Sequence, residues 1–184
     1  MRISPYLTRF CVLTALVLPL SVGCRASAPR GASASPTLRV VPFTVEPQAL
    51  PGAPADPGGV LQVLLAEEAA SSAREALARG GPGELAGVES IAGTVQMPVS
   101  LPPEVRGLDA RHREGHLATA TVRLLGPDGK TVRQAEASLA WWEVRWLEGP
   151  PRYRRYRSSG EVLRDAVGKV VERAVERLRK GHST

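Results

Sequence analysis

The chain has 184 residues, of which 43% are hydrophobic and 23% charged, and its net charge is +6. Two cysteines cannot form a disulfide framework, and we find no internal repeat and no heptad pattern long enough for a coiled coil. The length suits one domain with a modest core and a tail.

The first 24 residues combine a basic start with a short apolar run. Arg2 and Arg9 are followed by about eleven mostly apolar residues, 10–20, which favour a secretory signal over a membrane helix of about 20 residues. The run ends in Leu20-Ser21-Val22-Gly23-Cys24, which resembles the lipobox of bacterial lipoproteins. The resemblance implies that residues 1–23 are removed and that Cys24 becomes the acylated first residue, anchored in a membrane.

Two other interpretations of this segment stay open. Ala26-Ser27-Ala28 fits an ordinary cleavage site, but Pro29 follows it, and the segment could also remain as an anchor. If Cys11 leaves with the signal, the mature chain keeps only Cys24, and acylation explains a lone exported cysteine. Arg25 after the cysteine implies, by resemblance to lipoprotein sorting, the outer membrane with the domain facing the periplasm.

Residues 24–36 are mainly Ala, Ser, Gly and Pro, which predicts a flexible tether with a reach of about 20 Å. Residues 37–181 are predicted to form one domain and residues 182–184 a frayed tail. The first strand of this domain covers residues 38–45, with Pro42 at an edge or a bulge. A helix then runs from Asp56-Pro57 to Arg79, with its buried stripe at Leu61, Leu64, Leu65, Ala69, Ala73, Ala76 and Leu77.

Alternating apolar residues predict a second strand over 91–99 and a hairpin made of 118–124 and 131–146 around a Gly-Pro-Asp-Gly turn. A change of phase predicts a bulge at 140–142, with Trp141 and Trp142 on opposite faces. Ser158 and Glu161 have the spacing of a capping box. They open a helix with its stripe at Leu163, Val167, Val170, Val171, Ala174 and Leu178.

The element order β-α-β-β-β-α predicts an α+β fold, in which an antiparallel sheet of about four strands carries both helices on one face. This order is similar to that of the small periplasmic domains of the penicillin-binding-protein activator LpoB, the curli-secretion lipoprotein CsgG and the N-terminal domain of TolB. The likeness concerns element order over residues 37–181 and is a fold-level analogy. The short tether departs from the LpoB type.

Motifs for catalysis are weak. Residues 111–116, Arg-His-Arg-Glu-Gly-His, place two histidines near a glutamate, but the glutamate has the wrong offset for a helical zinc site and Gly115 opposes a helix. There is no phosphate-binding glycine loop and no nucleophile elbow. We therefore predict no enzyme activity, no cofactor and no metal.

Positive charge is concentrated at the end of the chain. Residues 145–184 contain 11 Lys and Arg against 5 Asp and Glu, whereas residues 24–144 contain 11 against 13. The segment PPRYRRYRSSG interleaves cations with aromatics, which suits either a solvated loop or a docking patch that is dispensable for folding. The predicted patch comprises Arg145, Trp146, Arg152, Tyr153, Arg154, Arg155, Tyr156 and Arg157.

Export makes nucleic acid an unsuitable partner for such a patch, although the same residues would suit it in the cytosol. Anionic lipid, lipopolysaccharide or an acidic protein is the expected partner. The sequence therefore predicts a non-enzymatic envelope lipoprotein that acts as an accessory or interaction module. The alternative is a carrier that holds a lipid or another amphiphile in an apolar cavity under the helices.

Overall fold

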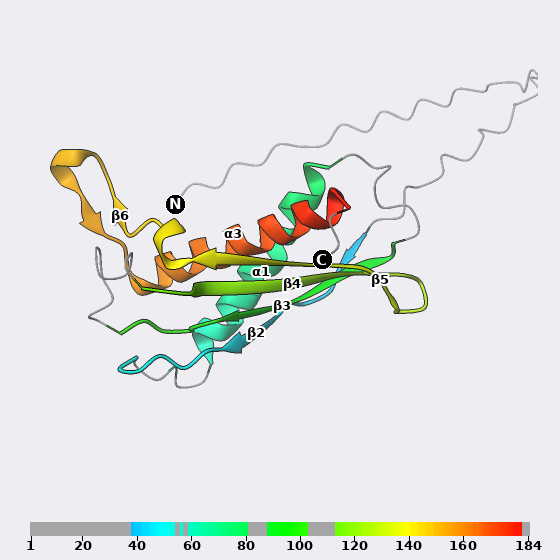
Figure 1. Ribbon diagram of the computed structural model, residues 1–184, viewed down its shortest axis with the longest axis horizontal. Coiled ribbons are helices and arrows are strands. Elements are labelled where there is room, and N and C mark those ends of the chain that lie inside the picture. The colour runs from blue at the N-terminus through cyan, green and yellow to red at the C-terminus, as the bar shows by residue number, and fades with distance from the viewer. Residues whose placement is uncertain (1–37, 54–55, 57–58, 81–87, 103–112, 182–184) are drawn as a thin grey trace, which may run out of the picture. The chain divides into compact units, whose positions relative to one another are not determined.

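The computed structural model describes residues 38–53, 56, 59–80, 88–102 and 113–181, all within one unit of residues 34–184. Two long helices and a mixed sheet make an α+β fold (Figure 1). The main elements are β1 (Arg39–Val40), β2 (Thr44–Pro47), α1 (Val60–Ala78), β3 (Ser90–Met97), β4 (His116–Leu125), β5 (Thr131–Ala140) and α3 (Ser159–Arg179). A small second sheet pairs β6 (Leu147–Glu148) with β7 (Arg155–Tyr156).

The main sheet is mixed and not wholly antiparallel as the sequence predicted. The strands β3, β4 and β5 form an antiparallel meander, but β1 and β2 both pair with β3 in parallel. The reason is the connection: α1 lies between β2 and β3, and a helical crossover returns the chain in the same direction, whereas a tight turn reverses it. The predicted first strand is also divided in two at residues 41–43.

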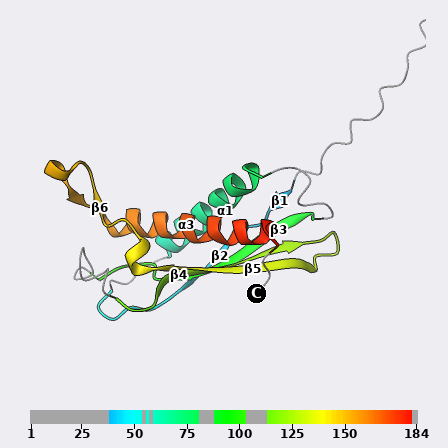
Figure 2. The ribbon, with the colours of Figure 1, turned by 45° about the horizontal axis from the view of Figure 1, so that its top comes forward.

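Both helices cover one face of the sheet, as predicted (Figure 2). The alternating side chains of β3, β4 and β5 supply one wall of the core, and the buried faces of α1 and α3 supply the other. Close approach of the helices is possible because the contacting residues are small; a Cβ on Gly168 of α3 would lie 3.2 Å from the Ser72 hydroxyl of α1. The buried residues of α3 are Val162, Leu163, Ala166, Val167, Val170, Val171, Ala174, Val175 and Leu178.

The segment between β1 and β2 closes one edge of the sheet. Pro42 lies in it, which confirms the predicted edge position. The ring of Phe43 then covers Gly93 of β3, and a side chain at Gly93 would overlap the Phe43 ring carbons. Phe43 thereby fills the place of the side chain that Gly93 lacks.

The first helix begins later than predicted. Its N-cap is Gly59, with a positive φ of 67°, and no side chain caps it there. The Asp56 carboxylate still accepts a 3.3 Å hydrogen bond from the backbone N–H of Gln62, and it thereby satisfies a free donor in the first turn of the helix. The predicted stripe is buried at Leu65, Ala69, Ala73 and Ala76, but Leu64 is exposed.

The strand β5 ends earlier than predicted, at Ala140. The predicted bulge is instead a 3-10 turn, η1 (Trp141–Glu143), in which the Glu143 carboxylate accepts a 2.7 Å bond from the Ala140 amide. Arg173 of α3 donates to the same carboxylate, and these two contacts lower the pKa of Glu143. One tryptophan of the predicted pair, Trp141, is buried and Trp142 is exposed, although neither is on a strand.

The final helix has the predicted capping box. The Ser158 hydroxyl accepts a bond from the Glu161 amide, and the Glu161 carboxylate accepts one from the Ser158 amide. Arginines of α3 also cover the free edge of β5, because Arg173 donates to the Ser138 carbonyl and Arg177 donates to that of Glu136. No helix in the described part of the chain is both long and apolar enough to cross a membrane.

Candidate functional site

The predicted docking patch lies in an arm, residues 145–157, that projects beyond the sheet and then returns to the start of α3 (Figure 1). Its two short strands pair Leu147 with Tyr156 and Glu148 with Arg155. Between them, Gly149 turns the chain with a φ of 97°, and a Cβ there would lie 2.6 Å from the Tyr153 carbonyl oxygen. A 3-10 turn, η2 (Pro151–Tyr153), completes the tip.

One arginine of the arm, Arg155, is held by two carboxylates. Its guanidinium lies 2.6 Å from the Glu148 carboxylate and 3.1 Å from that of Glu161. The hydrogen bond from Arg155, together with those from the amide and hydroxyl of Ser158, lowers the pKa of Glu161 to about 2. The same carboxylates raise the pKa of Arg155. Arg155 therefore links the strands of the arm to the capping box of α3.

A second arginine, Arg157, is largely enclosed, with only 18% of its side chain exposed. It donates to the Arg145 carbonyl at 3.0 Å, to the Glu161 carbonyl at 3.0 Å and to the Asp165 carboxylate at 3.2 Å. Arg157 is therefore not part of an exposed patch, and we expect it, unlike an exposed arginine, to contribute to the stability of the fold. Its fork ties the base of the arm to α3.

The other three arginines of the patch, Arg145, Arg152 and Arg154, are exposed, and their guanidinium groups have no hydrogen-bond or ion-pair partner within the described ranges. Arg145 and Arg154 line one small cleft of about 160 Å³. The other lining residues, Leu147 and Gly149, carry no charge. A cleft lined by two exposed arginines and by no acidic residue is positively charged and suits an anion.

The aromatic residues of the predicted patch separate into two groups. Tyr153 and Tyr156 are exposed on the arm. Trp146 is buried, which makes its inclusion in an exposed patch wrong: its ring stacks on Trp141 at 6.3 Å, and its Nε1 donates to the Trp141 carbonyl at 3.2 Å. The guanidinium over this pair comes from Arg113, 5.2 Å from the Trp141 ring. The alternation of side chains along a strand could not predict that Trp146 is buried, because the 3-10 turn η1 interrupts the strand before this residue.

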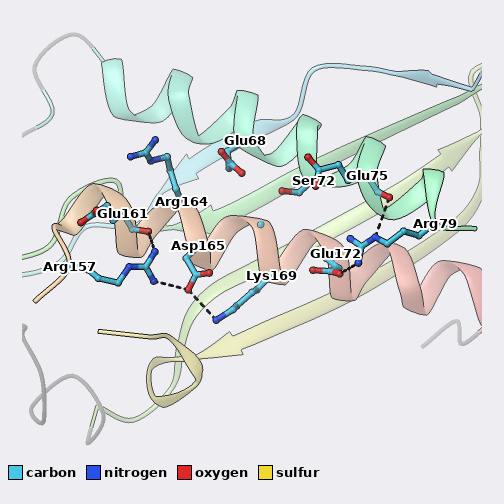
Figure 3. A pocket seen from close by; sticks show the side chains of 11 residues that line it. Glu68, Ser72, Glu75, Arg79, Arg157, Glu161, Arg164, Asp165, Lys169 and Glu172 are labelled. Atoms are coloured by element: carbon cyan, nitrogen blue, oxygen red, sulfur yellow. Dashed lines mark hydrogen bonds and ion pairs between the residues drawn. The ribbon is translucent and has the colours of Figure 1, made fainter. Parts of the chain in front are cut away.

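A larger hollow of about 460 Å³ lies between α1 and α3 (Figure 3). Charged side chains of both signs line it, and several neutralise one another. Arg79, the C-cap residue of α1, pairs with Glu172 of α3, and within α3 Lys169 pairs with Asp165 at 3.1 Å. Arg157 also reaches this groove from the base of the arm. The Arg79–Glu172 pair joins the two helices across this groove, which the sequence analysis did not single out.

The remaining predicted site residues lie elsewhere. Cys24 and His112 are outside the described residues, and His116 is exposed at the start of β4. In the part of the chain that the structure describes, no group of three His, Cys, Asp or Glu residues could hold a metal ion. Comparison of the chain with protein-family models, curated proteins and solved structures gives no match.

Proposed function

We propose that this chain is a non-enzymatic, lipid-anchored protein of the cell envelope whose domain is an accessory or interaction module. In this proposal the arm docks on an anionic partner: lipid headgroups, lipopolysaccharide or an acidic protein. The observation that carries it is the cleft of about 160 Å³ that Arg145 and Arg154, two exposed arginines, line together with no acidic residue.

Arginine suits this role because its planar fork gives paired hydrogen bonds to phosphate and carboxylate. The exposed rings of Tyr153 and Tyr156 add apolar area beside the cations, which is the usual composition of a protein-binding surface. Arg155 and Arg157 have a different part in this proposal. They hold the arm in one position, so that Arg145 and Arg154 are presented together.

Envelope location and anchoring are supported by the sequence of residues 1–24 alone. We test them by expressing the wild type and Cys24→Ala in a Gram-negative host and fractionating the cells. The wild type should remain with the outer membrane, and the variant should be released as a soluble protein. Equal solubility of the two would show that Cys24 is not an anchor.

The docking role has its own test. Arg145→Gln with Arg154→Gln should weaken binding to vesicles that contain anionic lipid, to lipopolysaccharide or to a co-purified partner, most at low salt. The control combines Arg39→Gln with Lys130→Gln, which removes the same charge from outside the arm. If both double variants weaken binding equally, general charge and not the cleft determines binding. The carrier hypothesis stays a prediction. It would be favoured if neither double variant changed lipid binding and if the affinity depended on the length of the acyl chain.

A further inference from the structure

The outward side of α1 is unusually apolar at its start. The first seven residues of the helix, Val-Leu-Gln-Val-Leu-Leu-Ala, carry no charge. Only one side of them faces the core, where Leu65 is buried. The exposed fractions are 60% for Val60, 58% for Val63 and 46% for Leu64. A helical segment that is apolar on every side is normally buried on every side. The exposed side of this segment therefore indicates an interaction surface.

A groove continues this apolar surface toward the edge of the sheet. Its volume is about 520 Å³, and it lies between α1 and the β1–β2 segment. Its lining is mostly apolar, with one carboxylate and one guanidinium, those of Glu67 and Arg74. We call the exposed aliphatics and this groove the outer α1 surface; it comprises Val40, Pro42, Phe43, Val60, Val63, Leu64, Ala66, Glu67, Ala70 and Arg74.

The chain enters the fold beside this surface. The first described residue is Leu38, and Val40, two positions later, lines the groove. Thirteen residues, 25–37, separate Leu38 from Cys24. A coil of that length reaches about 20 Å. An acylated Cys24 would therefore keep the bilayer within about that distance of the outer α1 surface.

We propose that the outer α1 surface docks on the lipid bilayer that holds Cys24, at the boundary between headgroups and acyl chains. This inference rests on the proposed lipid anchoring. Tethering makes the contact intramolecular, so a few aliphatic side chains suffice where a free domain would not stay bound. Under this anchoring, the bilayer is the apolar phase to which residues 25–37 connect Val40, which favours it over a second protein as the occupant.

Docking through aliphatics differs from docking through the arm in its response to salt. The first seven residues of α1 offer no cation to lipid phosphates, and the one cation of the groove, Arg74, lines it together with the acidic Glu67. Contact of the outer α1 surface with the bilayer should therefore persist at high salt, where contacts of Arg145 and Arg154 weaken. The two surfaces can thus be tested separately in one protein.

The sequence allows a single-site probe. Cys24 is the only cysteine after residue 11, and acylation would consume its thiol. The full chain with Val63→Cys, processed in a Gram-negative host, should therefore take one environment-sensitive dye, at position 63. Val132→Cys is the matched control, because Val132 on β5 is a valine with the same 58% exposure.

Both labelled proteins are placed in vesicles of phosphatidylethanolamine and phosphatidylglycerol whose acyl chains carry a quencher. We expect quenching at 63 to exceed that at 132 about threefold or more, at low and at high salt. Adding Val60→Ser and Leu64→Ser should lower the equilibrium constant for docking about fourfold to tenfold for each aliphatic removed. The melting temperature should not change, because both side chains are exposed.

Each failure has a separate meaning. Equal quenching at the two positions, or quenching at 63 that high salt abolishes, overturns the inference and leaves the anchor intact. Shielding of the dye at 63 only after envelope proteins are added also overturns it, in favour of a protein partner. A second dye on Cys24 would show that this thiol is not acylated, and would overturn the proposed function and this inference together.

Discussion

The guanidinium of Arg157 lies 3.2 Å from the carboxylate of Asp165, and this pair joins the base of the arm to the second turn of α3. The same guanidinium bonds two carbonyl oxygens, one on each side of the junction. Lys169 shares Asp165 at 3.1 Å. One carboxylate thus connects the arm with the charged groove between the helices, and the arm is not an independent loop.

We expect Arg157→Gln to lower the free energy of unfolding by about 1–2 kcal/mol. The substitution removes charge-assisted hydrogen bonds from a site that is largely screened from water, and the partial exposure of both partners reduces the value. The measurement is denaturant unfolding followed by tryptophan fluorescence. Arg152→Gln is the control, because Arg152 is exposed and should change stability by no more than about 0.5 kcal/mol. Equal effects of the two substitutions would contradict the structural role of Arg157.

At Gly93 the structure leaves no room for a side chain, because the Phe43 ring covers the position. Gly93→Ala should therefore cost about 1–3 kcal/mol through overpacking. Gly160→Ala, at a position in α3 where an added Cβ has no neighbour within 4 Å, should be neutral or stabilising by up to about 1 kcal/mol. Combining Gly93→Ala with Phe43→Leu should recover part of the loss. Thermal melts of the four proteins test this, and a Gly93→Ala protein as stable as the wild type would refute the close packing.

The capping carboxylate predicts how stability changes with pH. Glu161 has its folded-state pKa lowered from 4.5 to about 2, mainly by Arg155 and then by Ser158. Its ionised form thus adds stability above about pH 4.5, and that stability is lost as the pH falls toward 2. We expect Glu161→Gln to flatten the melting temperature between pH 4.5 and 2 relative to the wild type. Glu176→Gln, at an exposed position of the same helix, should keep the wild-type slope; a parallel curve for Glu161→Gln would contradict the assignment.

Local patterns were enough to predict some elements and long-range contacts determined the others. The capping box at Ser158 and the turn before Lys130 depend on neighbours in sequence, and both are present. The parallel pairing of β1 and β2 depends on the crossover of α1, which strand alternation does not encode. Leu64 was assigned to the buried stripe by helical spacing, but the sheet covers only one side of α1.

The candidate site was predicted in part, for a similar reason. Composition identified the arginine-rich segment, since charge and aromatics are visible in sequence. It could not separate the exposed Arg145 and Arg154 from Arg157, whose partner Asp165 is eight residues away and close only once α3 has formed. Nor could it reveal the apolar groove beside α1, because that surface needs the β1–β2 segment folded against the helix.

The last helix should be essential to the fold. Nine of its side chains are buried against the sheet and α1, and its arginines cover the edge of β5. Ending the chain before Ser159 should therefore abolish cooperative unfolding, and Leu163→Ala alone should cost about 2–5 kcal/mol. Near-ultraviolet circular dichroism is the measurement, because the stacked rings of Trp141 and Trp146 lie in the same core. Arg164 follows Leu163 directly and is exposed, so Arg164→Ala controls for the loss of a side chain on this helix and should leave the signal unchanged. A truncated chain that keeps both the signal and a cooperative melt would show that β3, β4 and β5 fold without α3, contrary to the burial of Val167 and Val171 between helix and sheet.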